Sequence, residues 1–200
     1  MARPLTFWFD FASTYSYLSA MRVEELAGAA GVEVTWQPFL LGPIFAAQGW
    51  DSSPFNLYPA KGRAMWRDIA RLAEDRGLPF QPPADPERFP QNSLAAARLA
   101  LVALDRPEGR DFCREVFRAQ FERGQDIAAE ATLADCLDRA HLPATLAAEA
   151  VSAENRPRLR AATESAAAAG IFGAPSFTFA DELFWGDDRL EQALDWARRE

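Results

Sequence analysis

The sequence lacks the residues and patterns on which several functional classes depend. One histidine and two cysteines among 200 residues cannot build a typical zinc site. The 21 basic residues form no cluster, and 29 acidic residues outnumber them to give a net charge of −8. This charge argues against nucleic acids and anionic membrane surfaces as partners. No apolar stretch approaches the roughly 20 residues that a membrane-spanning helix needs. We therefore expect neither a metal site nor a membrane segment.

The two cysteines and the N-terminal residues indicate the cellular compartment in which the protein folds. Cys113 and Cys136 lie in separate helical patterns with no second thiol nearby in the sequence, so we interpret both as reduced core residues. Residues 1–4 lead directly into an apolar segment that Asp10 interrupts, which leaves no room for a signal peptide. We expect a cytoplasmic protein.

Two strand-containing segments enclose a long helical one. Apolar runs and alternation predict strands at residues 5–11, 32–39, 176–179 and 183–185, the last two as a hairpin. Helical spacing predicts helices at residues 15–28, 61–76, 92–105, 108–123, 132–141, 143–153, 156–169 and 189–199. The order βαβ, helical insertion, ββα predicts an α/β protein with a thioredoxin-like sheet domain of residues 1–40 and 169–200. An all-α domain of residues 41–168 interrupts it.

A pair of serines after the first strand is the most informative feature. Ser13 and Ser16 stand where a redox chain of this fold carries Cys-x-x-Cys, with the first sulfur at a helix N-terminus. A serine cannot cycle through a disulfide, but its hydroxyl can donate a hydrogen bond to a thiolate that a ligand supplies. The pattern indicates a redox-like scaffold with a different chemistry.

Two interpretations of Ser13 stay open. Serine is preferred at the N-cap of a helix, so Ser13 could serve as a cap alone. Alternatively, its hydroxyl and the helix N-terminus together stabilise a thiolate. Lowering a thiol pKa by about two units needs about 2.7 kcal/mol, which one charged hydrogen bond and a helix terminus can supply. Because the chain has no suitable cysteine, the thiol would arrive on a ligand, and glutathione is the expected one.

The second half of the expected site lies far downstream. Pro175 follows a Gly-x-x-Gly segment and opens a returning strand, where we predict a cis peptide bond. The N–H and C=O groups of Ala174 would then turn outward to pair with the cysteinyl backbone of glutathione. Asp187 and Asp188 are candidates for the γ-glutamyl group, through backbone N–H groups and carboxylates, or else simple helix caps. Lys61 is a candidate for the glycine carboxylate, or else a solvated surface residue.

These segments together resemble a known family. Residues 9–17 (FDFASTYSY) are similar to the opening of the 2-hydroxychromene-2-carboxylate isomerases and of their relatives, the kappa-class glutathione transferases. Further similar segments cover residues 37–42, 50–56, 58–62, 65–68, 170–175 and 184–190. The resemblance implies a DsbA-type fold, usually dimeric, that binds glutathione and uses Ser13 to poise its thiol.

The resemblance also implies which residues contact glutathione. These are Lys61, Ala174, Trp185, Gly186, Asp187 and Asp188, and together with Ser13, Trp50 and Pro175 they make up nine candidate residues. Three positions depart from the family pattern. Thr14 replaces the more usual proline, Asp187 stands where many relatives have asparagine or serine, and Trp50 stands where transferase relatives often have asparagine. The residue at position 50 favours the isomerase branch.

We therefore expect a glutathione-dependent isomerase of aromatic-compound degradation, with Ser13 as its catalytic residue. It would interconvert 2-hydroxychromene-2-carboxylate and trans-o-hydroxybenzylidenepyruvate by addition of the glutathione thiolate to the opened ring system, bond rotation and expulsion of the thiol. Phe45 and Trp50 are candidates for the pocket of this small aromatic substrate, or else core residues. Two alternatives stay open: a kappa-like glutathione transferase or peroxidase acting on another electrophile, and a non-catalytic glutathione- or peptide-binding module.

Overall fold

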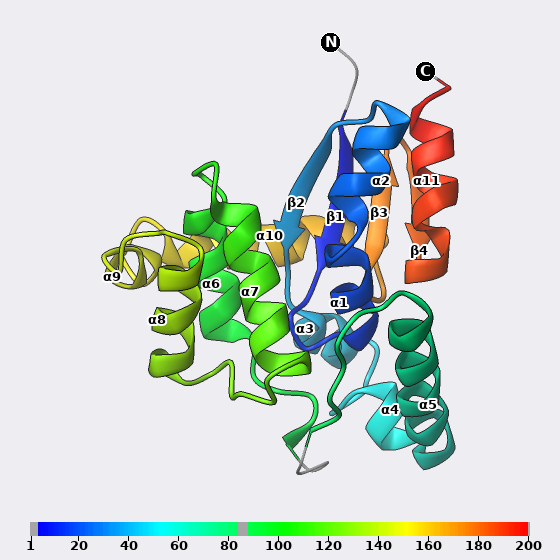
Figure 1. The fold of residues 1–200 in the computed structure, drawn as a ribbon, viewed down its shortest axis with the longest axis horizontal. Helices are drawn as coiled ribbons and strands as arrows, with labels where there is room; N and C mark the ends of the chain where they lie inside the picture. Colours follow the sequence, from blue (N-terminus) through cyan, green and yellow to red (C-terminus); the bar gives the residue numbers. More distant parts are fainter. Residues whose placement is uncertain (1–3, 84–87, 200) are drawn as a thin grey trace.

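The computed structural model describes residues 4–83 and 88–199. One half of the molecule is built around a four-stranded sheet (Figure 1). The strands are β1 (Leu5–Phe9), β2 (Val34–Pro38), β3 (Ser176–Phe179) and β4 (Glu182–Trp185), in the order β2-β1-β3-β4. β1 pairs in parallel with β2 and antiparallel with β3, and β3 pairs antiparallel with β4. The sheet therefore joins segments from the two ends of the chain, as the sequence predicts.

The side chains of β1 explain why this strand is central. Leu5, Phe7 and Phe9 are fully buried and lie on one face, as the alternation of a strand requires. The Phe7 ring stacks on Phe177 of β3 with centroids 5.4 Å apart, and the Phe9 ring meets Phe117 of the helical segment at 5.8 Å. Both the hairpin and the helical segment are thus anchored on the first strand.

The first predicted helix is in fact two helices, and this is a correction. α1 (Thr14–Ala20) ends at Met21, and α2 (Val23–Ala30) begins after Arg22, whose φ of −129° leaves the helical region. The Arg22 guanidinium is hydrogen-bonded to the Asp187 carbonyl oxygen and to the Glu191 carboxylate. The last helix, α11 (Leu190–Ala197), packs against α2 and β3 (Figure 1). The break between α1 and α2 therefore occurs where this helix and its preceding turn, η2 (Asp187–Arg189), bind Arg22.

Between β2 and β3 the described chain contains helices and no strand, as predicted. They are α3 (Leu41–Ala47), α4 (Pro54–Leu57), α5 (Pro59–Asp75), α6 (Leu94–Ala103), α7 (Gly109–Phe121), α8 (Glu130–Arg139), α9 (Leu146–Ala150) and α10 (Arg156–Ala168). No sequence pattern predicts α3 and α4, which are only seven and four residues long. The cis Phe89–Pro90 bond is likewise not predicted from the sequence.

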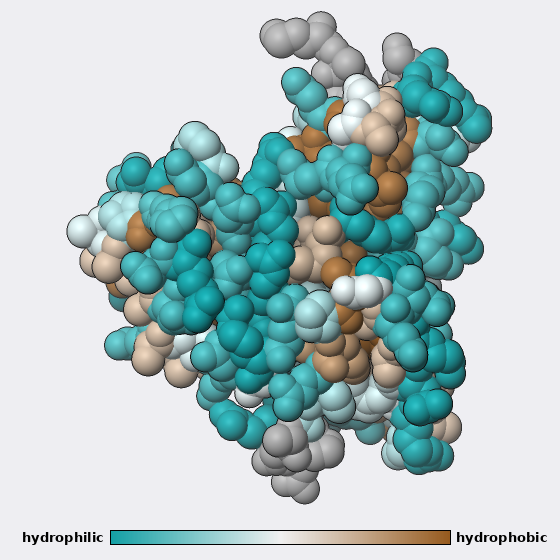
Figure 2. Space-filling view, in the orientation of Figure 1, coloured by the Kyte–Doolittle hydropathy of each residue, from teal (hydrophilic) through white to brown (hydrophobic). Residues whose placement is uncertain are grey.

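The helical segment and the sheet share one continuous core. α6 and α10 both contact β2, and α7 contacts α1. The domain limits at residues 40 and 169 therefore stay a prediction. Residues 1–3, 84–87 and 200 of the predicted domains lie outside the described part. Hydrophilic side chains cover most of the face in Figure 2, and apolar ones reach the surface in its middle, between the group of α6 to α8 and α5. Among the helices described, none has the length and apolar character needed to cross a membrane.

Candidate active site

A cavity of about 1460 Å³ opens where the start of α1, the segment before β3, η2 and the α4–α5 region meet. All nine candidate residues line it, although they are spread from position 13 to position 188. They are Ser13, Trp50, Lys61, Ala174, Pro175, Trp185, Gly186, Asp187 and Asp188. The fold therefore brings every predicted site residue to one cavity, which makes the cavity the candidate active site.

Ser13 lies at the junction of the two halves of the site. It is the N-cap of α1, and its Oγ accepts a hydrogen bond from the Ser16 N–H at 3.2 Å. The same hydroxyl donates to the Ala174 carbonyl oxygen at 2.8 Å, and Ser13 is only 9% exposed. The capping role is thus confirmed. The Ser13 hydroxyl proton is already hydrogen-bonded to the Ala174 carbonyl oxygen. A bound thiolate would have to replace that oxygen as the acceptor.

The Ala174–Pro175 segment is partly as predicted. The peptide bond between these residues is cis, which confirms the prediction. The prediction that both backbone groups of Ala174 are free is wrong for the carbonyl, because its oxygen accepts a hydrogen bond from the Ser13 hydroxyl. The Ala174 N–H, in contrast, forms no hydrogen bond with the described residues. Since a carbonyl oxygen has two lone pairs, it can still accept a second hydrogen bond.

Two aromatic side chains form the exposed rim beside this segment. Trp185 is 54% exposed and Phe172 is 46% exposed, and their ring centroids lie 4.9 Å apart. Gly173 makes this arrangement possible, because a Cβ at that position would collide with the Trp185 indole nitrogen. Trp185 is among the predicted site residues, whereas Phe172 is not. An exposed apolar pair of this kind is typical of a ligand contact.

The position of Asp187 corrects one prediction. Its carboxylate is not free for a ligand ammonium group, because it accepts a hydrogen bond from the Ser19 hydroxyl at 2.8 Å. Arg76 Nη2 lies 2.7 Å from Asp187 Oδ2, and Arg22 Nε lies 3.4 Å from Oδ1. Asp187 is 3% exposed, so two cations compensate a charge that would otherwise be costly to bury.

Asp188, the next residue, is placed differently. Its side chain is 73% exposed and, among the described residues, forms an ion pair with the neighbouring Arg189 alone, at 3.2 Å. Gly186 precedes the turn with a φ of +109°, and a Cβ there would meet Asp188 Oδ1 at 2.5 Å, so this position requires glycine. Neither the Asp187 N–H nor the Asp188 N–H forms a backbone hydrogen bond with the described residues. The turn therefore presents two unused donors and one exposed carboxylate.

A further part of the cavity wall comes from the segment between α3 and the first turn of α5, which carries Trp50 and Lys61. Lys61 belongs to the first turn of α5, and its Nζ lies 4.7 Å from the centroid of the Tyr58 ring. Trp50 packs against Phe45 with ring centroids 5.7 Å apart. This wall thus combines one cation with aromatic side chains.

The structure also reveals Tyr15 as a cavity residue that sequence reasoning treated only as part of a helix. The Tyr15 hydroxyl donates to Asp68 Oδ2 at 2.9 Å. Burial raises the pKa of Tyr15, and the hydrogen bond to Asp68 and the charge of that carboxylate raise it further. Tyr15 is therefore a neutral phenol at physiological pH. Its position two residues after Ser13 was the available signal.

Asp10 is a second cavity residue that the sequence analysis noted only as an interruption of an apolar run. It is 3% exposed, and its carboxylate accepts hydrogen bonds from the N–H groups of Ala12 at 2.9 Å and Leu41 at 2.8 Å. Burial raises the pKa of Asp10, against the opposing effect of these hydrogen bonds. Because its carbonyl oxygen also accepts the Ser13 N–H, Asp10 holds the turn that positions Ser13.

Known proteins show which family shares this architecture. The model of the DSBA-like thioredoxin domain matches residues 4–196. A 2-hydroxychromene-2-carboxylate isomerase of Sphingobium xenophagum is 28% identical, with 96% of both chains covered. Glutathione s-transferase kappa 2 of Caenorhabditis elegans is 26% identical, over 95% of this chain and 89% of that one.

A solved 2-hydroxychromene-2-carboxylate isomerase superposes with a TM-score of 0.85 at 24% identity, covering 98% of this chain and 95% of the other. The cytosolic disulfide reductase DsbM from Pseudomonas aeruginosa, solved with GSH, gives a TM-score of 0.63 at 19% identity, over 98% and 96% of the two chains. These superpositions concern the fold alone. The resemblance to the isomerases is thus confirmed in sequence and in fold, and the chain belongs to the DSBA-like thioredoxin domain family.

Proposed function

We propose that this protein is a glutathione-dependent isomerase that interconverts 2-hydroxychromene-2-carboxylate and trans-o-hydroxybenzylidenepyruvate. The observation that carries the proposal is the place of the Ser13 hydroxyl, at the start of α1 and against Ala174, in a cavity that every candidate residue lines. Relatives in Sphingobium xenophagum and Pseudomonas putida, 28% and 27% identical, bear the isomerase name. A homodimer and a cytoplasmic location stay predictions.

The residues present fit glutathione at each of its ends. The unused N–H of Ala174 would bind the cysteinyl carbonyl group, and the unused N–H groups of Asp187 and Asp188 would bind the γ-glutamyl carboxylate. The exposed Asp188 carboxylate would bind the ammonium group, and Lys61 would bind the glycine carboxylate. Asp187 would contribute through its backbone alone, since Arg22 and Arg76 already neutralise its side chain.

Bound glutathione would supply a thiolate nucleophile, which neither buried cysteine of the chain can provide. The part of Ser13 is to stabilise that charge. Its hydroxyl would turn its proton away from the Ala174 carbonyl oxygen and toward the sulfur, while still accepting the Ser16 N–H. A hydrogen bond to an ionised group contributes about 1.5–3 kcal/mol, against about 1 kcal/mol for the neutral bond that it replaces. The exchange is favourable, and it lowers the pKa of the bound thiol by about one unit.

The cavity has room for a second molecule. Its volume of about 1460 Å³ exceeds the roughly 300–1,000 Å³ of a typical small-ligand site. Phe45, Trp50 and Phe55 line it, and their flat apolar faces suit an aromatic substrate. Tyr15, kept protonated by its raised pKa, borders the same space as a neutral polar group.

A kappa-like glutathione transferase or peroxidase is the second candidate. The relative of Caenorhabditis elegans that supports it is 26% identical, close to the value of the isomerase relatives. The same Ser13 site would serve both activities, and the substrate in the aromatic part of the cavity would distinguish them. A non-catalytic glutathione-binding module is the third.

Turnover and binding together separate these candidates. Isomerisation of 2-hydroxychromene-2-carboxylate is measured with and without glutathione, for the wild type and for Ser13→Ala. We expect glutathione-dependent turnover that falls steeply in Ser13→Ala. Conjugation of general electrophiles without isomerisation would identify the transferase. A glutathione-induced thermal shift without either activity would identify the binding module, since saturation to about 100 times the dissociation constant stabilises by about 2.7 kcal/mol.

A further inference from the structure

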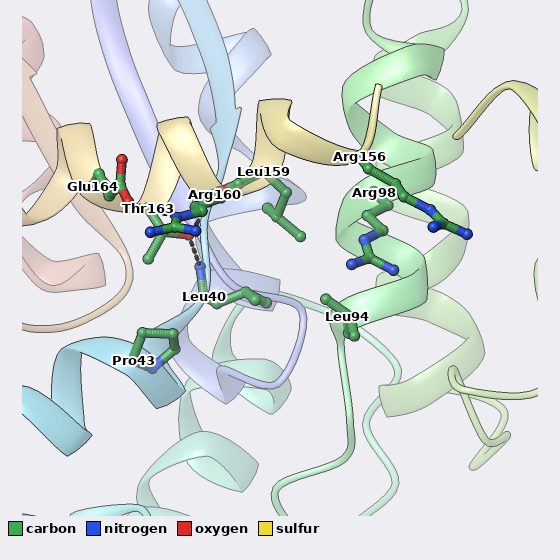
Figure 3. Close-up of a pocket in the computed structure, with 9 residues that line it drawn as sticks. All are labelled: Leu40, Pro43, Leu94, Arg98, Arg156, Leu159, Arg160, Thr163 and Glu164. Atoms are coloured by element: carbon green, nitrogen blue, oxygen red, sulfur yellow. Dashed lines mark hydrogen bonds and ion pairs between the residues drawn. The ribbon is translucent and has the colours of Figure 1, made fainter. Parts of the chain in front are cut away.

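A second, smaller cleft of about 310 Å³ lies between α6, α10 and the start of α3 (Figure 3). Three arginines face it: Arg98 from α6, and Arg156 and Arg160 from α10. Figure 3 shows the guanidinium groups of Arg98 and Arg156 on one side of the cleft and that of Arg160 on the other. With Glu164 as the one acidic residue of the lining, the cleft has a local excess of positive charge in a chain whose net charge is −8.

Within the described part of the chain, one of the three arginines has a counter-charge. Arg160 Nε lies 2.8 Å from the Glu164 carboxylate, and the other ion pair of α10 is that of Arg158 with Asp105. Arg98 and Arg156 take part in no ion pair with any residue of the described segments. Arg98 Nε is moreover buried without a hydrogen-bond partner in that part of the chain. A buried donor without a partner costs about 1–3 kcal/mol, and two neighbouring cations add their mutual repulsion.

The rest of the lining is apolar except for Thr163 and Glu164. The Thr163 hydroxyl is hydrogen-bonded to the backbone of Leu159 and Leu40, and the Glu164 carboxylate is paired with Arg160. Leu40, Leu94 and Leu159 form the walls around the arginines, and Leu159 is only 2% exposed. A free phosphate ion would gain nothing from these leucines. An acid with a flat apolar body would bury that body against them and place its carboxylate on a guanidinium fork, which binds carboxylates in a bidentate manner.

We propose that this cleft binds a small aromatic carboxylic acid, with Arg98 as the main partner of the carboxylate and Arg156 as the second. The volume of about 310 Å³ lies at the lower end of small-ligand sites and suits a single-ring acid. Leu40 and Leu94 also line the large cavity, so the two sites share a wall. The proposal does not depend on the isomerase reaction.

Binding of 4-fluorobenzoate, followed by fluorine NMR on the full chain, tests this site. Arg98→Gln is expected to weaken the affinity about tenfold or more, since it removes a charge-assisted hydrogen bond. Arg156→Gln is expected to weaken it about two- to fivefold, because that side chain is exposed. The matched control is Lys61→Gln, which removes one positive charge from the large cavity and is expected to leave the affinity unchanged. The neutral isostere 4-fluorobenzamide is expected to bind far more weakly than the acid.

Several outcomes would overturn the proposal. They are absence of saturable binding, unchanged affinity in a folded Arg98→Gln variant, and equal binding of acid and amide. Loss of binding in Lys61→Gln would place the acid in the large cavity. Displacement of the probe by equimolar inorganic phosphate would make the cleft a general oxyanion site and refute the aromatic ligand. If Arg98→Gln does not fold, Arg156→Gln and the comparison of acid with amide decide the question.

Discussion

The hydroxyl of Ser13 donates a hydrogen bond to the carbonyl oxygen of Ala174, 2.8 Å away across 161 positions of sequence. This bond joins the start of α1 to the segment that opens β3. A serine hydroxyl has only one proton, so the Ala174 carbonyl and a ligand thiolate would compete for it. Because a hydrogen bond to the thiolate is charge-assisted and therefore stronger, we expect the Ser13 hydroxyl to donate to the thiolate when the ligand is bound.

Ser13→Ala tests this competition. The variant should lose about 1–2 kcal/mol of stability, since it loses the cap of α1 and the bond to Ala174. The pKa of bound glutathione should rise by about a unit or more, as measured by the ultraviolet absorbance of the thiolate against pH.

Ser16→Ala is the matched control for Ser13→Ala. The Ser16 hydroxyl is buried and has no hydrogen-bond partner among the described residues, so its removal should cost little stability. It should leave the thiol pKa unchanged. Equal thiol pKa values in the wild type and Ser13→Ala would reduce Ser13 to a helix cap.

Asp187→Ala should mainly affect the stability of the fold, and Asp188→Ala should mainly affect glutathione binding. Asp187→Ala leaves Arg22 and Arg76 without their shared carboxylate and should cost on the order of 3 kcal/mol, measured by denaturant unfolding. Asp188→Ala removes an exposed carboxylate and should change stability by no more than about 0.5 kcal/mol, but it should reduce the thermal shift caused by glutathione. A stable Asp187→Ala variant would show that the two arginines do not need this carboxylate.

The protein should not reduce protein disulfides by itself. Cys113 and Cys136 are buried, and burial raises the pKa of both thiols, that of Cys136 to about 12. At neutral pH neither thiol is ionised to a useful degree, and the thiolate is the reactive species. An insulin-reduction assay measures this activity. Turnover that disappears in Cys113→Ser or Cys136→Ser would contradict the prediction.

Alkaline pH should destabilise the fold through Tyr15 and Tyr17. Burial raises the pKa of both phenols above the ordinary value of 10.0, with further increases from Asp68 and Glu122 respectively. A folded-state pKa above the unfolded one means that the stabilisation is complete below about pH 10 and decreases as the pH rises further. Absorbance of tyrosinate should therefore reach the amplitude of all three tyrosines only when the protein unfolds. Tyr15→Phe and Tyr17→Phe should each reduce this loss of stability, and full ionisation near pH 10 in the folded protein would refute it.

Local patterns were sufficient to predict much of the fold. The alternation of Val34 and Trp36 and the apolar run before Asp10 determine strands, because a strand buries every second residue or both faces. The break at Arg22 could not be predicted in this way. It coincides with contacts to Asp187 and Glu191, which lie far along the chain, and helical spacing contains no information about such partners.

The sequence by itself determined that Ser13 caps a helix, that no redox pair follows β1, and which family the motifs resemble. Only the tertiary structure decided what each site residue contacts. In the folded chain the Ser13 hydroxyl donates a hydrogen bond to the Ala174 carbonyl oxygen. The Asp187 carboxylate lies between two arginines, whereas the Asp188 side chain is exposed. Asp187 and Asp188 are neighbouring residues of the same type, so the difference in their burial and ion pairing arises from packing and not from local propensity. A cap depends on its own turn, whereas burial and ion pairing depend on segments that only the folded chain brings together.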